Sequence, residues 1–282
     1  MYTYTVQTGD TLASIAKRFY NDYTKYTLIA QVNHIQNPAN IGIGQVLKIP
    51  ILSDGKTPAT VEIDASTFPL PSHKYYSEIF PKTSIVLHFT AGLSAQSAYH
   101  TFLRLSSRTA TSYIIDRDGK IYELFPPRFW ALHLFRHQHG EPPIYYQLEQ
   151  KTIAVELVNV GPLKPDASNR RQLNWWWPPH PITGKETFGT RWCELDEVDK
   201  YVKKHDRGID YFATFTEDQY ESAKKLLEHL GVLFGIPMLA PVNKLTTELE
   251  NMITFRGITS HQKYRQDKWD IGPAFDWTKV GL

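Results

Sequence analysis

Near the C-terminus, residues 254–277 place an imidazole and a carboxylate close together in the chain, at His261 and Asp270, with Lys268 between them. Imidazole nitrogen and carboxylate oxygen are two of the ligand types that Zn²⁺ accepts in catalytic sites. Such a zinc ion keeps three protein ligands and an open position for water. The third candidate is His88, in the run SIVLHFTAG. His88 lies far from the C-terminal stretch in sequence, so only the folding of the chain can bring the three residues together. The fold of the intervening chain must therefore place them side by side.

Composition limits which metal site and which partners this chain can have. The only cysteine, Cys193, excludes an intrachain disulfide and a zinc site built from several cysteines, so a metal here must use histidine and carboxylate ligands. The formal net charge of the 282 residues is +2, far from the strongly basic balance of nucleic-acid-binding proteins. We therefore predict no nucleic-acid partner, and any attraction to acidic polymers must be local.

The N-terminus and the apolar runs bear on where the protein is made. The first residues, MYTYTVQTGDTL, lack the basic and apolar regions of a secretory signal peptide. No run approaches the roughly 20 apolar residues that span a bilayer. We expect a protein without a membrane span that is synthesised in the cytoplasm and reaches any external target by another route.

The length of the chain predicts two domains of unequal size, of which residues 1–50 form the smaller. The pair Gly9-Asp10 predicts a turn and a helix N-cap, and Leu12, Ile15 and Phe19 then recur at helical spacing. The predicted order is β-α-α-β, with strands at 4–7 and 45–49 and helices at 11–19 and 24–33. This pattern indicates a compact module.

In YTVQTGDTLASIAKRF and IGIGQVLKIP this first segment resembles a LysM module. The resemblance implies binding of glycans that contain N-acetylglucosamine, such as peptidoglycan and chitin. The alternative is a small helical domain that mediates protein contacts. Residues 51–80, which contain Asp54-Gly55 and several prolines, predict a linker and an extended lead-in to a second domain at 81–282.

The second domain is predicted to begin with a strand at 84–89. Val86 and His88 share one face of this strand, because a strand presents alternate side chains to opposite faces. A single histidine beside a core is more often hydrogen-bonded there than a metal ligand. The candidate ligands His261 and Asp270 favour the ligand role for His88.

Another predicted strand, at 152–158, carries a carboxylate in an apolar run. Glu156 stands among Val155 and Leu157 and shares a face with Ala154. Burying a carboxylate there is costly unless it is paired or lines a cleft. Burial beside a cation and a metal also tunes a catalytic acid or base. The alternative is a salt-bridged or exposed glutamate at a sheet edge.

Four segments follow, in order, the pattern of zinc-dependent N-acetylmuramoyl-L-alanine amidases: VLHFTAG, TSYIIDRDGKIYELF, TIAVELVN and SHQKYRQDKWDIGPAFDW. The chain resembles this family, which includes the animal peptidoglycan-recognition proteins, over about 81–161 and 214–278. The resemblance implies an α/β (α+β) domain with a mixed central sheet flanked by helices. It also implies hydrolysis of the amide between N-acetylmuramic acid and L-alanine of the stem peptide.

The resemblance assigns roles to individual residues. It implies that His88, His261 and Asp270 hold zinc, that Glu156 moves protons as the catalytic glutamate, and that Lys268 stabilises the oxyanion. The alternative for Lys268 is a solvated lysine, which its position two residues before a ligand disfavours.

Two further residues have less certain counterparts in the family. Tyr113 lies where many members have an active-site tyrosine, and it is equally compatible with an ordinary strand aromatic. His133, in FWALHL, falls where the family often has a Trp-His-Ala loop near the substrate, but the match is partial. Both are candidates for substrate binding.

The family pattern is lost between about 161 and 212, so this part is predicted to be a long insertion without regular elements. Its run of tryptophans at 175–177 could line a groove, contact a partner or hold the insertion against the domain. A helix at 216–235 follows, since Thr216 and Gln219 form a capping-box pattern ahead of an apolar stripe.

Two rival functions fit the sequence less well. A non-catalytic peptidoglycan-binding protein is disfavoured because recognition members of the family lack a complete ligand set. A muramidase would need two carboxylates that flank a sugar bond, and the sequence marks no such pair. A glycan-binding module favours the intact wall as target, which implies release as a phage lysin or delivery by a contractile (type VI) secretion system. An effector of the latter kind could meet a cognate immunity protein.

Overall fold

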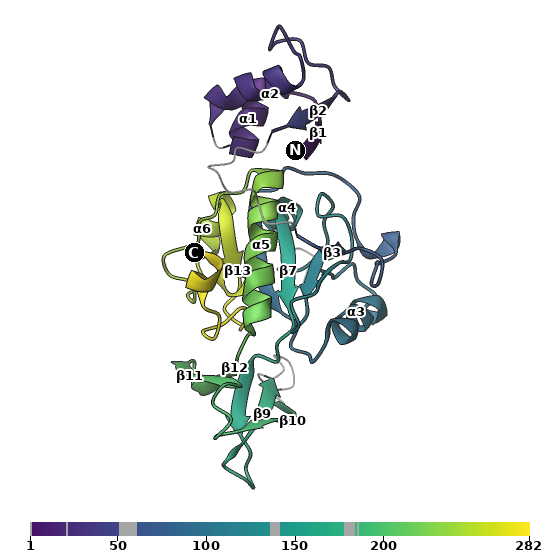
Figure 1. Cartoon of the computed structure of the whole chain (residues 1–282). Coiled ribbons are helices and arrows are strands. Elements are labelled where there is room, and N and C mark those ends of the chain that lie inside the picture. The colour runs from purple at the N-terminus through teal and green to yellow at the C-terminus, as the bar shows by residue number, and fades with distance from the viewer. Residues whose placement is uncertain (1, 21, 51–60, 136–141, 178–183, 185) are drawn as a thin grey trace.

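The computed structural model describes residues 2–20, 22–50, 61–135, 142–177, 184 and 186–282. Figure 1 shows a small N-terminal unit, a central sheet with helices packed on it, and a smaller sheet beyond the lower end of the central one. Of the predicted linker, residues 51–60 lie outside the described residues.

The N-terminal unit has the predicted β-α-α-β order, which is confirmed. Its elements are β1 (Tyr2–Thr5), α1 (Leu12–Tyr20), the 3-10 turn η1 (Tyr23–Lys25), α2 (Tyr26–Val32) and β2 (Val46–Ile49). The strands β1 and β2 pair antiparallel. The predicted cap is shifted by one residue: Thr11 accepts a hydrogen bond from the Ser14 N–H at 3.0 Å, whereas Asp10 accepts from the Tyr4 hydroxyl at 2.6 Å. Asp10 therefore closes the turn rather than capping α1.

The central sheet is mixed and has six strands in the order β13-β4-β7-β5-β6-β3. The bounds are β3 (Ile63–Asp64), β4 (Ser84–Phe89), β5 (Tyr113–Ile115), β6 (Ile121–Glu123), β7 (Thr152–Leu157) and β13 (Gly257–Ser260). The neighbours β13, β4, β7 and β5 run parallel, and β6 returns antiparallel to β5. The predicted mixed sheet is confirmed. Strand β3 comes from the predicted lead-in, so that segment is part of the domain.

Helices flank this sheet. They are α3 (Ala95–Arg104), α4 (Pro143–Lys151), α5 (Glu217–Phe234) and α6 (Leu249–Thr254), with 3-10 turns η2 (Ser72–Lys74), η3 (His261–Lys263) and η4 (Trp277–Val280). The long α5 crosses one face of the sheet (Figure 1) and carries the predicted capping box of Thr216 and Gln219. Its Leu226, Leu227 and Leu230 are fully buried in the largest core cluster. A rigid layer thus supports the strands that carry the site.

The prediction of an insertion without regular elements is wrong, because this part of the chain forms a second sheet. Five antiparallel strands lie in the order β10-β9-β8-β12-β11: β8 (Pro162–Pro165), β9 (Gln172–Trp177), β10 (Thr187–Glu194), β11 (Tyr201–Asp206) and β12 (Ile209–Ala213). Register shifts interrupt β10 and β11, which blurs the two-residue alternation that marks a strand in a sequence. The chain enters this second sheet directly after β7 and returns to the central domain before α5.

Candidate metal centre and active site

Three adjacent parallel strands end at one edge of the central sheet, and each delivers a candidate residue there. His88 lies near the end of β4, and the register pairs it with Glu156 of β7. His261 follows directly after β13, the other neighbour of β4. Ligands bind at the carboxyl ends of parallel strands in open sheets of this kind. The sheet therefore explains how residues far apart in sequence meet.

The three predicted metal ligands converge. The Oδ2 atom of Asp270 lies 2.8 Å from Nδ1 of His88 and 3.0 Å from Nδ1 of His261. All three residues are buried, and their candidate ligand atoms lie within 4.8 Å of one another. Zinc bonds of about 2.0–2.1 Å at tetrahedral angles place neighbouring ligand atoms about 3.3 Å apart. This donor set fits such an ion after small side-chain shifts, and its oxygen and nitrogen atoms are of the types zinc accepts.

Electrostatics favours an ionised carboxylate at the centre of this group. Burial alone raises the pKa of Asp270, but the charge of His261 and the hydrogen bonds from His261 and His88 outweigh it and hold the pKa well below its usual range. Metal ligands must be deprotonated to bind. Asp270 is therefore ready as an anionic ligand.

The second ring nitrogen of His261 is fixed by the main chain. Nε2 lies 2.8 Å from the carbonyl oxygen of Leu134, which can only accept, so Nε2 carries the proton and donates it. The Gln262 N–H also donates to the Asp270 carbonyl at 2.9 Å, which closes the segment between the two ligands. Such second contacts orient metal-ligating histidines.

A relay of hydrogen bonds fixes His88 in the same way. Its Nε2 lies 3.0 Å from Nδ1 of His133, whose Nε2 lies 2.8 Å from the Thr152 hydroxyl, which donates to the Leu148 carbonyl at 2.8 Å. Because that carbonyl can only accept, the protons point from His88 towards Leu148. Burial, followed by the charge of His88, lowers the pKa of His133 well below its usual value, so His133 is neutral. Nδ1 of His88 is left to face the ligand group.

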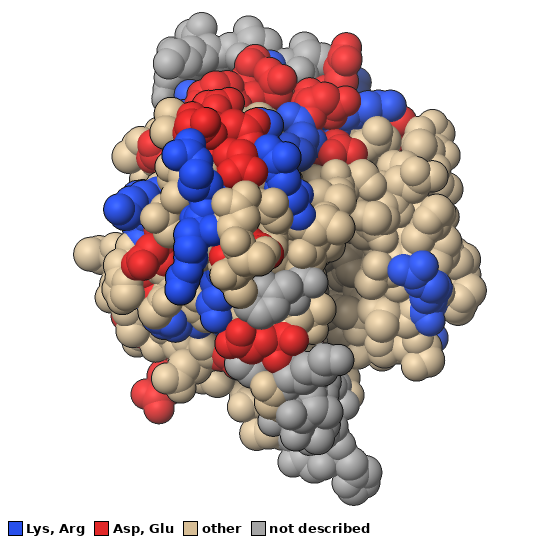
Figure 2. Space-filling model, turned by 90° about the horizontal axis from the view of Figure 1, so that it is seen from below, with Lys and Arg blue, Asp and Glu red and all other residues tan. Residues whose placement is uncertain are grey.

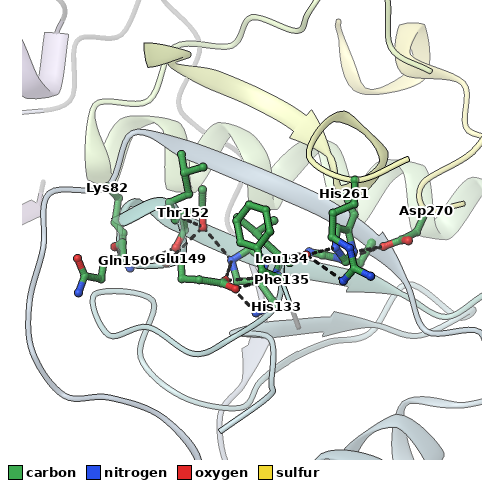
Figure 3. A network of polar contacts seen from close by, with 12 residues as sticks. Lys82, His133, Leu134, Phe135, Glu149, Gln150, Thr152, His261 and Asp270 are labelled. Carbon is green, nitrogen blue, oxygen red and sulfur yellow. Dashed lines mark hydrogen bonds and ion pairs between the residues drawn. The ribbon is translucent and has the colours of Figure 1, made fainter. Parts of the chain in front are cut away.

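Glu149 holds the main chain around His133, the middle residue of this relay. Its buried carboxylate accepts from the main-chain N–H groups of His133, Leu134 and Phe135 at 2.9, 3.0 and 3.1 Å (Figure 3). The same carboxylate lies 3.6 Å from Nε2 of His133. Hydrogen bonds to a buried carboxylate are among the stronger ones. The segment that holds both His88 and His261 is thereby fixed.

Changing Thr152 to valine is expected to weaken zinc binding about tenfold while the protein stays folded, because loss of a supporting contact of this kind commonly costs 10–100-fold in affinity. Valine keeps the shape but cannot continue the relay. Competition with a chelator measures the effect. The matched control is Thr259→Val, since the Thr259 hydroxyl is buried in β13 and lies 3.6 Å from the Met252 sulfur, away from the relay. Equal affinity in both variants would refute the role of the relay.

Glu156 is poised to exchange a proton near neutral pH. Its Oε2 atom is buried without a hydrogen-bond partner in the described structure. Burial raises the pKa of Glu156 to about 7, and Asp270 adds to the rise, while the charges of His88 and Lys268 oppose it. A catalytic acid or base works best when its pKa lies near the working pH.

The raised pKa also predicts how stability changes with pH. Between its usual pKa of 4.5 and about 7, Glu156 keeps its proton in the folded state and loses it in the unfolded state. Metal-free wild-type protein should therefore lose stability across this window relative to metal-free Glu156→Gln, by about 3 kcal/mol above pH 7. Denaturant unfolding at pH 4 and pH 8 checks this. A constant difference between the two proteins would contradict the assigned burial.

A cavity of about 920 Å³ opens over the ligand group, and Glu156, Lys268, Trp177 and Arg207 are among its lining residues. A smaller cavity of about 290 Å³ adjoins it and shares Glu156 with it. Figure 2 shows the underside of the molecule, where positive and negative side chains intermingle over one part and few charges lie beside the central hollow. The cavity can therefore hold a sizeable ligand against Glu156.

Comparison with known families assigns both parts of the chain. Residues 80–273 match the family model of N-acetylmuramoyl-L-alanine amidase. The chain belongs to this family. Residues 4–50 match the LysM domain model, so the chain joins a LysM domain to an amidase-family domain.

Individual relatives are similar over shorter parts or with low identity. An esterase of Mycobacterium tuberculosis is 57% identical over 53 residues, which cover 18% of this chain and 12% of the esterase. An uncharacterised protein of Deinococcus radiodurans is 49% identical over 47 residues, or 17% of this chain and 19% of that protein. The chain thus spans about an eighth of the esterase.

Two solved structures are similar to this amidase-family chain. The N-acetylmuramyl-L-alanine amidase AmiD of E. coli, in complex with its substrate, has a TM-score of 0.40 at 17% identity and covers 72% of this chain and 58% of its own. The N-acetylmuramoyl-L-alanine amidase LysC of Clostridium intestinale has a TM-score of 0.36 at 14% identity and covers 78% and 95%.

Tyr113 does not lie with the other candidates in this amidase-family domain. It is 2% exposed and packs in the core, where its hydroxyl donates to Glu123 at 2.9 Å. Among the described residues it does not line either cavity. Its predicted contact with substrate stays a prediction. His133 lines the larger cavity, and its Nδ1 also supports His88 through the contact at 3.0 Å.

The three consecutive tryptophans divide between two of the predicted roles. Trp176 packs edge-on against Trp269, with ring centroids 5.6 Å apart, and holds the second sheet against the domain. Trp177 is 37% exposed and lines the larger cavity. Trp175 lines the smaller one. Both the holding role and the groove role are therefore present in one strand.

Three residues that the structure places in support of the site carry no signal in the sequence. Glu149 lies in the last turn of a helix like any amphipathic carboxylate, Thr152 begins a strand, and Arg207 lies far from the family motifs. Their roles depend on main-chain groups from other segments. A sequence pattern does not record such partners.

Proposed function

We propose that this protein is a zinc-dependent amidase that hydrolyses the bond between the lactyl group of N-acetylmuramic acid and L-alanine of the stem peptide. The observation that supports this most is the buried group of His88, His261 and Asp270 beside Glu156 at the cavity wall. When bound there, Zn²⁺ supplies Lewis-acid chemistry, which polarises a carbonyl and makes water nucleophilic near neutral pH.

The residues of the chain then divide the remaining work. Glu156 takes the proton of the attacking water on its unpartnered Oε2 and passes it to the leaving amine of L-alanine. A pKa near 7 suits both directions of transfer. Lys268 lines the same cavity, and its positive charge stabilises the oxyanion of the tetrahedral intermediate, an effect commonly of a few kcal/mol.

We propose that the substrate is the intact polymer rather than a small fragment. The LysM domain would hold the glycan strands and raise the local concentration of cleavable bonds, since linked binding modules act at a high effective concentration. Trp177 offers an exposed indole to the bound chain at the cavity wall. Aromatic rings supply rigid apolar contact area with a polar handle.

The setting follows from the need to reach a cell wall. Release with a phage, or delivery through a contractile secretion system with a cognate immunity protein, stays a prediction. Within the described residues, none of the helices is both long and apolar enough to cross a membrane.

Digestion of purified sacculi tests the proposal. Zinc-loaded protein is expected to release stem peptides with free L-alanine amino groups and to leave peptide-free glycan, and metal-stripped protein is the control. Mass spectrometry after muramidase treatment identifies both products. Binding without any product would favour a recognition protein, and new reducing sugar ends would favour a muramidase; either result would overturn the proposal.

A further inference from the structure

The segment that carries Lys268 and Asp270 is held by the second sheet. Nη1 of Arg207 donates to the carbonyl oxygens of Gln266 at 3.0 Å and Lys268 at 2.8 Å. The guanidinium carbon of Arg207 also lies 3.7 Å from the ring centroid of Trp269. One side chain of the turn between β11 and β12 thus contacts Gln266, Lys268 and Trp269, three of the four residues that precede Asp270.

Two more contacts from the same sheet reach this segment. Nζ of Lys204, in β11, donates to the Pro273 carbonyl at 3.0 Å. Trp269 packs between Trp176 of β9 and Phe212 of β12, at ring centroid distances of 5.6 and 6.3 Å. The second sheet therefore holds the segment at both ends and in its middle.

The turn that presents Arg207 is unusual for its residue type. Asp206 pairs with Ile209, so Arg207 and Gly208 form a two-residue hairpin turn, with φ values of +48° and +81°. Asparagine, aspartate or glycine is preferred at the first position of such turns, because other side chains disfavour positive φ. Residues held in this region often have a functional reason. The Asp206 carboxylate lies 3.2 Å from Nε of Arg207 and orients its guanidinium group.

We propose that Arg207 is a positioning residue and that the second sheet is a built-in clamp for residues 266–273. The clamp sets the distance of Lys268 and Asp270 from Glu156. This inference rests on the proposed function for the meaning of those three residues. Small misplacement of a group that acts in the transition state can cost 10²-fold in rate. An alternative is that Arg207, which lines the larger cavity, binds substrate directly.

The test compares Arg207→Met with Lys203→Met. Both variants remove one positive charge from β11 or its turn, but Nζ of Lys203 lies over the Tyr211 ring of the second sheet itself, 6.0 Å from the ring centroid. Methionine at 207 keeps an apolar stem over Trp269 and loses both carbonyl contacts. Amide hydrogen exchange of residues 265–272, in zinc-loaded and metal-free protein without substrate, is expected to become at least tenfold faster in Arg207→Met only.

Kinetics separates the clamp from direct substrate binding. Arg207→Met is expected to lower kcat by 10–100-fold with KM changed less than threefold, and Arg207→Lys to recover only part, since lysine lacks the planar fork and the stacked ring contact. Unchanged exchange in Arg207→Met, or a raised KM with unchanged kcat, would overturn the proposal.

A second variant keeps the test decisive if Arg207→Met does not fold. Lys204→Met removes the Pro273 contact and keeps Arg207, so faster exchange is expected at the amides of Ile271 and Gly272, and unchanged exchange there would contradict the clamp. The exchange measurement needs no substrate. A wild-type protein without amidase activity would therefore refute the proposed function, while exchange would still judge the clamp.

Discussion

Replacing Glu156 by glutamine lowers kcat about a thousandfold, we expect, while the protein keeps its full zinc content. General acid and base catalysis commonly contributes 10²–10⁴-fold, and Glu156 would serve as both base and acid. Glutamine matches the shape of glutamate but cannot accept the proton of water. Glu156 is not among the three converging ligands, so metal binding should not need it.

The measurement pairs kcat on a soluble muropeptide with zinc content by elemental analysis. The control is Glu62→Gln, which changes the same functional group at an exposed position. A Glu156→Gln protein that retains wild-type kcat would end the assigned mechanism. Loss of zinc along with activity would instead make Glu156 a part of the metal site.

Replacing Asp270 by alanine should remove zinc and activity together. The Oδ2 atom of Asp270 lies within 3.0 Å of a ring nitrogen of both His88 and His261, so its loss leaves two buried imidazoles without their shared anion. Two histidines alone provide less than the three protein ligands of a catalytic zinc site. We expect less than about one tenth of the wild-type zinc content and no hydrolysis above background.

Zinc titration of the refolded or dialysed protein measures this loss, and circular dichroism verifies that the fold is intact. Asp218→Ala is the control, because Asp218 is an exposed carboxylate in the first turn of α5. If Asp270→Ala bound zinc as tightly as the control, Asp270 would not be a ligand.

Much of the site could be predicted from sequence because its residues break the apolar pattern of buried strands. His88 and Glu156 are polar residues inside apolar runs, and the structure places them side by side in adjacent strands. The pair His261 and Asp270 lies in one short segment. Burying polar or charged side chains costs free energy, so such residues indicate a binding or catalytic role. The β-α-α-β unit was also readable, since its helices and strands have regular spacing.

What the sequence could not reveal depends on contacts with main-chain groups or on interrupted strands. The five strands of the second sheet are short, with register shifts, and aromatic residues point to both faces of β9. Glu149 accepts hydrogen bonds from main-chain N–H groups, and Arg207 donates to main-chain carbonyl oxygens of a distant segment. Because nearly every residue has these groups, the sequence does not mark the partners. For Tyr113 both sequence interpretations stay open, although its side chain is buried in the core.

Hydrolysis of sacculi in water labelled with heavy oxygen tests the central claim most directly. Attack of water on the lactyl carbonyl places the label in the carboxylate of muramic acid, and the released stem peptide carries an unlabelled L-alanine amino terminus. Mass spectrometry of both products locates the label. We predict label in the muramyl carboxylate with wild-type protein, and the same label formed about a thousandfold more slowly with Glu156→Gln. Label in a peptide carboxylate or at a sugar reducing end would contradict the assignment of the cleaved bond.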